Sequence, residues 1–247
     1  MVTLSELKID FAGKPETVFF GIPDSKEELR EMYELRYKVY AKRGYIDSSK
    51  YKNLKETDDI DNNDLAKYFI AKFKGQIVGS VRLIQKEGRL PTEDVFDFDK
   101  IELLENLEYR QKGELSRLIS VPPQGGIYFP RNIVMIFLIK ILVDYGNKND
   151  IKAGYAFIKK SLDSKLRLLS MPIHKIDNYK LEVSRGDVLY NYFTQKEDPV
   201  VPMYFVTLEF GKYIENFLKR YTNKTDDNIY ELKNNLFTFF LKKMRIL

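Results

Sequence analysis

The chain has 247 residues, a length that fits one large domain or two small ones, and its 41 basic and 36 acidic residues give a formal net charge of +5. This mild positive excess suits an anionic partner, such as a carrier protein, a phosphate-bearing cofactor or nucleic acid, although most surfaces of this charge are simply solvated. The absence of cysteine excludes disulfides, thiolate metal sites and a covalent acyl-thioenzyme, and the single histidine, His174, argues against a histidine-ligated zinc.

The N-terminal residues, MVTLSELKIDFAGK, have neither the charged head nor the long apolar core of a signal peptide. Nowhere does the sequence contain the run of about 18 uninterrupted apolar residues that a membrane-spanning helix needs. We therefore expect a cytoplasmic protein without a transmembrane helix.

The first predicted elements are a strand at Glu16–Ile22 and a helix at Lys26–Lys42. Pro23 ends the strand, and Asp24 or Ser25 can cap the helix that follows. The helix carries apolar side chains at helical spacing: Leu29, Met32, Leu35 and Val39.

The segment Tyr45–Asp64 is polar and acidic, without apolar periodicity, and is predicted to be a long loop. Its aspartates, at positions 58, 59, 61 and 64, could suggest a calcium loop. Their spacing lacks the alternation, the glycine and the closing glutamate that an EF-hand loop needs, so we predict no metal site.

A β-hairpin is predicted next, with strands at Lys67–Phe73 and Gln76–Ile84 and a Lys-Gly turn between them. Arg82 lies between Val81 and Leu83 in the second strand, so it is predicted to be partly buried. The loop after the hairpin contains VFDFD, in which Phe96 or Phe98 is predicted to fold back as a hydrophobic lid or plug. A short helix is predicted at Asp99–Leu107.

The segment Gly113–Pro123, GELSRLISVPP, reads as a buried strand that carries Glu114, Ser116 and Arg117. Buried charges need a partner or a task, so both a structural ion pair and a reactive site remain open. Glu114 and Arg117 are three residues apart and would point to opposite faces of a regular strand. Either a bulge brings them together, which we favour, or Arg117 binds a different partner such as Asp58 or Asp61. A pair of Glu114 with Arg82 is equally available.

A glycine-bearing loop follows, QGGIYFPRN, and leads into an apolar helix at Ile133–Tyr145. A loop of this kind before a helix N-terminus can bind an anion, although a plain loop is an equal alternative. The residues that would form this cofactor site are Gln124, Gly125, Gly126 and Arg131. The later predicted elements are strands at Gly154–Ile158, Pro172–Ile176, Tyr179–Val183 and Val201–Glu209, and helices at Ser161–Leu169 and Asn228–Ile246.

The order of these elements predicts an α/β (α+β) fold with a mixed sheet flanked by helices. We expect one domain at residues 1–220, followed by a basic amphipathic helix at 221–247 that packs on the domain or lies at its periphery. The linker-like stretch of the chain is TNKTDDN at 222–228. The segment Ile229–Leu247 could also contact a membrane surface.

Five motifs resemble the acyl-homoserine-lactone synthase family and its relatives, the N-acyl amino acid synthases, which have the Gcn5-related N-acetyltransferase fold. The motifs occur in the family's order and spacing over about residues 30–180. They are RYKVYAKRGY at 36–45, ETDDIDNNDLAKYFI at 56–70, GSVRLI at 79–84, ELSRLIS at 114–120 and MPIHKI at 171–176.

The resemblance implies a charged cluster that orders the N-terminal loops beside the acyl site. The positions that match the family's residues are Arg36, Tyr40, Asp58, Asp61, Arg82, Glu114 and Arg117. The predicted substrate site consists of Arg36, Tyr40, Tyr45, Asp58, Asp61, Arg82, Phe98 and Arg117. Tyr45 stands where the family has a tryptophan, which weakens the case for S-adenosylmethionine as the amine substrate. The loop after Ser120 also lacks the glycine signature of acetyl-CoA enzymes, which makes ordinary acetyl transfer less favoured.

The resemblance therefore predicts an N-acyltransferase that moves a fatty acyl group from acyl carrier protein, or from acyl-CoA, to the amine of an amino acid. A thioester is already activated, so direct attack needs only a general base, for which Glu114 is the candidate. A backbone N–H at Ser120 or Val121 is the candidate oxyanion donor. No tightly bound cofactor and no nucleic-acid partner are expected. An autoinducer synthase that uses S-adenosylmethionine and a non-catalytic binding module on the same fold remain alternatives.

Overall fold

The computed structural model describes residues 1–11, 14–123, 131–187 and 189–233. Its strands are β1 (Val2–Phe11), β2 (Lys14–Ile22), β3 (Ala66–Phe73), β4 (Gln76–Ile84), β5 (Phe96–Asp97), β6 (Lys112–Ser120), β7 (Ala153–Lys159), β8 (Ile173–Lys175), β9 (Lys180–Leu181), β10 (Val200–Val206), β11 (Thr222–Asp226) and β12 (Ile229–Leu232). Its helices are α1 (Lys26–Lys42), η1 (Ser48–Lys50), α2 (Asp59–Asn62), α3 (Pro91–Val95), α4 (Glu102–Glu105), η2 (Tyr109–Gln111), α5 (Arg131–Lys148), α6 (Lys160–Leu168), α7 (Tyr190–Thr194) and α8 (Thr207–Tyr221).

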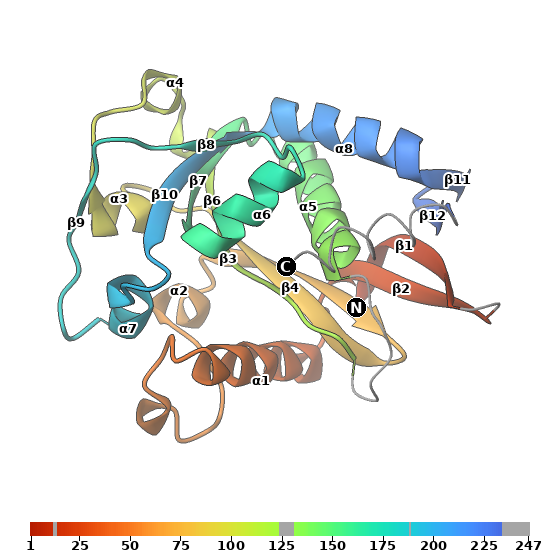
Figure 1. The fold of residues 1–247 in the computed structure, drawn as a ribbon, viewed down its shortest axis with the longest axis horizontal. Coiled ribbons are helices and arrows are strands. Elements are labelled where there is room, and N and C mark those ends of the chain that lie inside the picture. The colour runs from red at the N-terminus through yellow and green to blue at the C-terminus, as the bar shows by residue number, and fades with distance from the viewer. Residues whose placement is uncertain (12–13, 124–130, 188, 234–247) are drawn as a thin grey trace.

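A large mixed sheet organises the described part of the chain, with strand order β11-β12-β1-β2-β3-β4-β6-β7-β10-β8 (Figure 1). Most neighbouring strands are antiparallel, whereas β6 runs parallel to β7 and β1 runs parallel to β12. Helices α1 and α5 cover opposite faces of the sheet. The main hydrophobic core lies beneath α5, because this helix is apolar around most of its surface. The predicted mixed α/β architecture is confirmed.

Helix α1 has the predicted bounds, and the predicted cap is confirmed, since the Ser25 side chain accepts from the Glu28 backbone N–H. The buried face differs from the apolar stripe that the sequence suggested. Its buried residues recur every fourth position and are Glu28, Met32, Arg36 and Tyr40. The helix thus turns a charged and aromatic face toward the sheet, because these polar groups find partners there.

The ends of the chain differ most from expectation. Strand β1 was not predicted, and the strand predicted at Val201–Glu209 ends at Val206, where helix α8 begins. The stretch predicted as a linker and helix start forms the hairpin β11–β12 instead, because β12 gains backbone partners from β1. The rest of the predicted C-terminal helix lies outside the described residues. In the described ranges, no helix combines the length and apolar character needed to span a membrane.

Strands β6 and β7 pair over only part of their length. The parallel register runs from Lys112 opposite Ala153 to Leu115 opposite Ala156, and both strands then continue without pairing each other. Gly113 and Gly154 face each other within the paired part, where a Cβ on Gly154 would lie 1.8 Å from the Gly113 carbonyl oxygen. The two backbones are therefore close at one end, and they part at the other.

Candidate active site

A β-bulge in β6 lies where β6 and β7 part. Ser80 of β4 is opposite Ile119, but Arg82 is opposite Ser116, so β6 holds one extra residue between these pairs. The extra residue is Arg117, whose backbone adopts the left-handed conformation with a φ of 56°. The bulge turns Arg117 to the same sheet face as Glu114 and Ser116. Leu115 and Leu118 pack on the main core on the other face.

The predicted bulge is thus confirmed, but the pairing that it was expected to produce is not. The Arg117 guanidinium binds Glu56 at 2.8 Å and Asp58 at 2.8 Å, and no ion pair joins it to Glu114 within the described ranges. The partner Asp58 is one that the sequence offered as the alternative. The pairing of Glu114 with Arg82 is also absent there, because Arg82 binds Asp58 and Asp61 instead.

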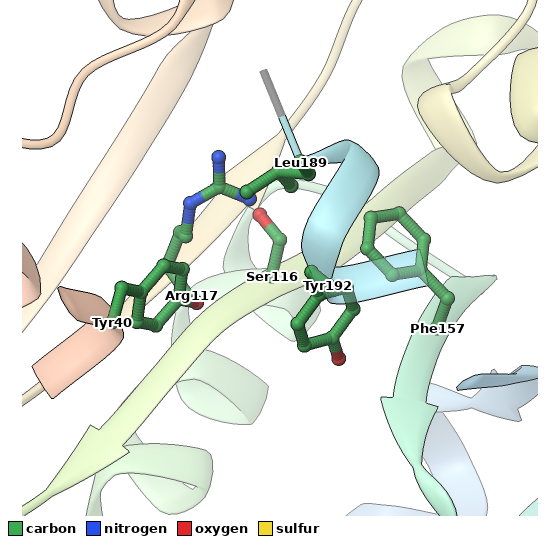
Figure 2. Close-up of a pocket in the computed structure, with 6 residues that line it drawn as sticks. All are labelled: Tyr40, Ser116, Arg117, Phe157, Leu189 and Tyr192. Atoms are coloured by element: carbon green, nitrogen blue, oxygen red, sulfur yellow. The ribbon is translucent and has the colours of Figure 1, made fainter. Parts of the chain in front are cut away.

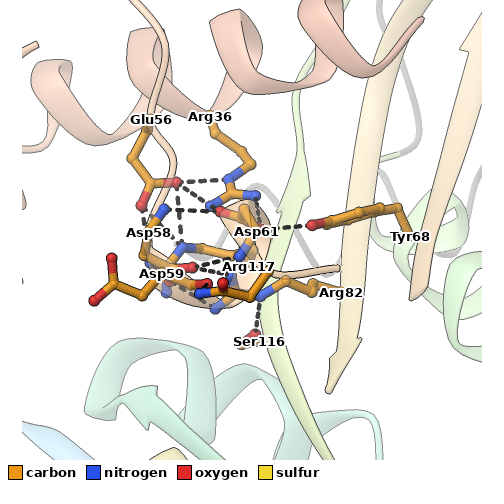
Figure 3. A network of polar contacts seen from close by, with 10 residues as sticks. Arg36, Glu56, Asp58, Asp59, Asp61, Tyr68, Arg82, Ser116 and Arg117 are labelled. Carbon is orange, nitrogen blue, oxygen red and sulfur yellow. Dashed lines mark hydrogen bonds and ion pairs between the residues drawn. The ribbon is translucent and has the colours of Figure 1, made fainter. Parts of the chain in front are cut away.

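Three arginines and three carboxylates form a closed ring of ion pairs on this face (Figure 3). Each carboxylate bridges two arginines and each arginine bridges two carboxylates, so the formal charges cancel. The ring distances are Arg36–Glu56 at 2.6 Å, Glu56–Arg117 at 2.8 Å, Arg117–Asp58 at 2.8 Å, Asp58–Arg82 at 2.7 Å, Arg82–Asp61 at 2.8 Å and Asp61–Arg36 at 2.7 Å.

Two neutral side chains add to this ring. The Tyr68 hydroxyl donates to Asp61 at 2.8 Å, and Arg82 Nε donates to the Ser116 hydroxyl at 2.9 Å. Although burial by itself raises the pKa of Glu56, the charges of Arg117 and Arg36 hold that pKa at about 2. Burial also disfavours ionised Asp61, but Arg36 and Arg82 hold its pKa well below the usual range. The carboxylates of Glu56 and Asp61 therefore stay ionised at neutral pH and are unsuited to take a proton.

The segment predicted as a loop without regular structure supplies all three carboxylates. Its short helix α2 begins at Asp58, which forms a capping box with Asp61, and this cap places both carboxylates toward the arginines. Sequence reasoning found these two aspartates but missed Glu56, which is fully buried. Glu56 lies in the same acidic run, ETDDID, and nothing in that run marks it as different from its neighbours.

A small cavity opens where β6 and β7 part (Figure 2). Ser116 and Arg117 contribute from β6, Phe157 contributes from β7, and the remaining side chains come from α1 and from the segment around α7. The residues lining it are Tyr40, Ser116, Arg117, Phe157, Leu189 and Tyr192. The cavity therefore combines apolar walls with a small polar side formed by the bulge.

Glu114 is fully buried and lies on the strand face of Ser116, but it does not line the cavity. One carboxylate oxygen accepts from the Thr92 backbone N–H at 2.7 Å, and the other has no hydrogen-bond partner in the described structure. Burial raises the pKa of Glu114 to about 7, and the Thr92 N–H only partly offsets this. Glu114 can therefore both hold and release a proton near neutral pH, which suits a general base.

The other predicted site residues are placed as follows. The Tyr45 ring meets Tyr192 edge-to-face at 4.9 Å, and the Phe98 ring meets Tyr155 at 5.7 Å. Ser120 lies opposite Gly79 in the ladder with β4.

The Val121 N–H donates to the Val78 carbonyl at 2.9 Å, so it is not available as an oxyanion donor, and the prediction for this residue is wrong. Of the predicted cofactor loop, Gln124, Gly125 and Gly126 lie outside the described residues. Arg131 begins α5, and its side chain is likewise not described.

The chain matches one known protein family. The family model for N-acyl amino acid synthase FeeM matches residues 31–161, which includes the ring, Glu114 and most of the cavity lining. No curated protein sequence matches the chain.

Three solved structures are similar to the chain. The acyl-homoserine-lactone synthase LasI has a TM-score of 0.53 and 18% identity, with 77% of this chain and 89% of that chain covered. MesI, described as a CoA-dependent acyl-homoserine lactone synthase, has a TM-score of 0.56 and 18% identity, over 83% and 92%. FeeM, from uncultured soil microbes, has a TM-score of 0.52 and 15% identity, over 79% and 93%. At these identities the likeness concerns the fold, and it confirms the fold class predicted from the motifs.

Proposed function

Because the chain belongs to the FeeM family of N-acyl amino acid synthases and is an acyltransferase, we propose that it transfers a fatty acyl group from a carrier thioester to the amine of an amino acid. The observation that carries the proposal is Glu114. This buried carboxyl has one oxygen without a partner and a pKa near 7, on the same strand face as the cavity residue Ser116.

The proposed reaction is direct aminolysis of the thioester. The amine nitrogen attacks the carbonyl carbon, the new C–N bond forms, and the C–S bond then breaks to release the carrier thiolate. Glu114 takes the proton that the amine loses, directly or through one water, and the thiolate is protonated as it leaves. No nucleophilic side chain is needed, which agrees with a chain that has no cysteine.

The ion-pair ring is proposed to position the site. Its charges are mutually satisfied, and the charged groups of Glu56 and Asp61 do not exchange protons near neutral pH. The ion pairs fix the 56–61 segment against β4 and β6. Arg117 also packs against the aromatic ring of Tyr40, and the Arg117 guanidinium carbon lies 5.6 Å from the centroid of that ring. Together they hold the polar side of the cavity in place.

The proposed acyl donor is acyl carrier protein or acyl-CoA, both of which are anionic and suit the excess of positive charge on the chain. Either donor satisfies the chemistry. The cofactor loop predicted at Gln124–Gly126 and Arg131, and an oxyanion donor at Ser120, remain part of the proposal.

A second candidate is an autoinducer synthase that acylates S-adenosylmethionine. It is favoured by the fold shared with LasI and MesI. Tyr45 argues against this second candidate. It stands where the resembled family has a tryptophan, and its ring packs on Tyr192 of the cavity wall, so the replacement lies beside the proposed site.

The test combines the purified protein with acyl carrier protein or CoA loaded with C8–C16 chains, and with a panel of amino acids and S-adenosylmethionine. Mass spectrometry then reads the acceptor and the chain length of any product. We expect an open-chain N-acyl amino acid from the wild type and a loss of about 10²-fold or more in kcat from Glu114→Gln. Glu87→Gln, at an exposed glutamate, is the matched control. A fully active Glu114→Gln enzyme would remove the base from the mechanism, and an absence of every acyl-amide would overturn the proposed function.

A further inference from the structure

Lys159, the last residue of β7, is a buried lysine without a carboxylate partner in the described parts of the chain. Only 4% of its surface is exposed. Its ammonium donates to the Tyr192 backbone carbonyl and lies 4.4 Å from the centroid of the Tyr192 ring and 5.1 Å from that of Tyr45. Asp198, the nearest acid by its electrostatic effect, instead accepts from the Ser161 N–H and hydroxyl at 2.8 and 2.6 Å.

A second buried lysine shows how unusual this is. Lys140, in α5, is equally buried at 4%, but its ammonium binds Asp144 at 2.7 Å. A buried ammonium that has only a carbonyl and aromatic faces around it is poorly solvated and lacks a counter-ion. Burial accordingly lowers the pKa of Lys159 to about 8. An anion placed beside Lys159 would therefore be stabilised strongly.

Lys159 and the cavity share a neighbouring residue, Tyr192. Tyr192 lines the cavity and also holds Lys159 through its ring and its carbonyl, and Phe157, two residues before Lys159, shares its strand face and lines the cavity too. The arginines beside the cavity have no charge to offer a ligand, because the ring neutralises all three. Among the buried lysines and arginines of the described structure, Lys159 is thus the one without an ion-pair partner.

We infer that Lys159 binds the carboxylate of the acceptor and so makes the enzyme selective for amino acids over simple amines. The inference rests on the proposed function and names the part of the acceptor that the chain recognises.

The experiment compares amino acids with the amines that lack only their carboxylate: phenylalanine with 2-phenylethylamine, leucine with isoamylamine, and glycine with methylamine. For each pair, kcat/KM is measured with the same acyl donor. We expect the wild type to favour the amino acid by about 10- to 100-fold, the value of one charge-assisted hydrogen bond. Lys159→Met should remove most of this preference, chiefly through a higher KM for the amino acid.

Two variants separate recognition from folding. Lys160→Met, at the exposed neighbouring lysine, is expected to keep the full preference, and Lys159→Arg, which keeps a positive charge, is expected to retain part of it. Thermal unfolding of Lys159→Met is measured alongside.

If the wild type uses amines and amino acids equally, or if the folded Met variant keeps the preference, the inference is wrong while acyl transfer stands. If the wild type acylates neither class, the proposed function itself fails.

Discussion

At the scale of single residues, the left-handed conformation of Arg117 determines which side chains meet. A regular strand would send Arg117 toward α5 and leave Glu56 buried beside one arginine only. The bulge gives Glu56 a second arginine and gives the cavity its polar side. Glu114 remains apart from the ring, which keeps its carboxyl away from charges that would hold it ionised.

Removing one carboxylate of the ring should cost much stability. Glu56→Gln leaves Arg36 and Arg117 buried with less than their full counter-charge, so the free energy of unfolding should fall by about 3–5 kcal/mol. Urea unfolding measures this. Asp59→Asn, at the exposed neighbour in the same acidic run, should change it by less than about 0.5 kcal/mol. Equal effects from the two variants would show that the ring contributes nothing specific.

Glu114 should also give the protein a measurable pH dependence. Its pKa is raised from 4.5 to about 7, so between these values the folded state binds more protons than the unfolded state. The stability that Glu114 contributes is therefore complete below pH 4.5 and is lost as the pH rises to about 7, a change of about 3 kcal/mol.

The measurement is the difference in unfolding free energy between the wild type and Glu114→Gln across this range. The kcat of the wild type should rise over the same interval, because only the ionised carboxylate accepts a proton. A difference that does not vary with pH would contradict the raised pKa.

At the scale of elements, the close approach of β6 and β7 leaves no room for a side chain at Gly154. Gly154→Ala would place a methyl group against the Gly113 backbone and the Phe205 ring, and neither can move away without separating the strands. We expect a loss of at least about 3 kcal/mol in the free energy of unfolding, or failure to fold.

Gly146→Ala is the matched control for this change. Its added methyl group would meet ordinary contacts of 3.5 Å or more inside α5, and a helix interior favours alanine. The free energy of unfolding should stay the same or rise by up to about 1 kcal/mol. A tolerated Gly154→Ala would mean that the paired ends of β6 and β7 can separate without harm.

The elements predicted correctly are those whose signals are local. Helix α1 follows from its cap and its length, and the β3–β4 hairpin follows from its turn and alternating pattern. β12 could not be predicted, because besides its hairpin partner β11 it pairs with β1, which lies more than 200 positions earlier in the sequence. Glu56 was missed for the same reason, because its role depends on contacts between distant parts of the sequence: its arginine partners come from α1 and β6 and meet only in the folded chain.

At the scale of the whole molecule, the sheet joins the two ends of the chain. Tyr230 in β12 is 8% exposed and packs its ring against Phe137 of α5, so the hairpin after α8 contributes to the main core. A proposed domain boundary near residue 220 therefore has to account for β11 and β12, which continue the sheet beyond β1.

Two truncations test this arrangement. A chain that ends at Lys233 keeps β11 and β12, whereas a chain that ends at Tyr221 loses them and uncovers the edge of β1. We expect the shorter chain to melt at least about 5 °C lower and to self-associate in size-exclusion chromatography. Equal melting temperatures would show that the hairpin is dispensable. A vesicle-binding assay on the full chain and the Lys233 truncation tests the proposed membrane contact of the C-terminal segment.

The ion-pair ring has one further consequence, which follows from its having no ends. Cutting a closed loop at one link leaves an open chain in which every remaining ion still has a neighbour of opposite sign. Removing two adjacent members, as in Arg36→Met with Glu56→Gln, leaves a shorter chain that is again electrically neutral. The double variant should therefore be more stable than the sum of its two single variants indicates. We therefore expect related sequences to replace an arginine and its neighbouring carboxylate together. The four ions that remain form a neutral chain, which still holds the 56–61 segment in place.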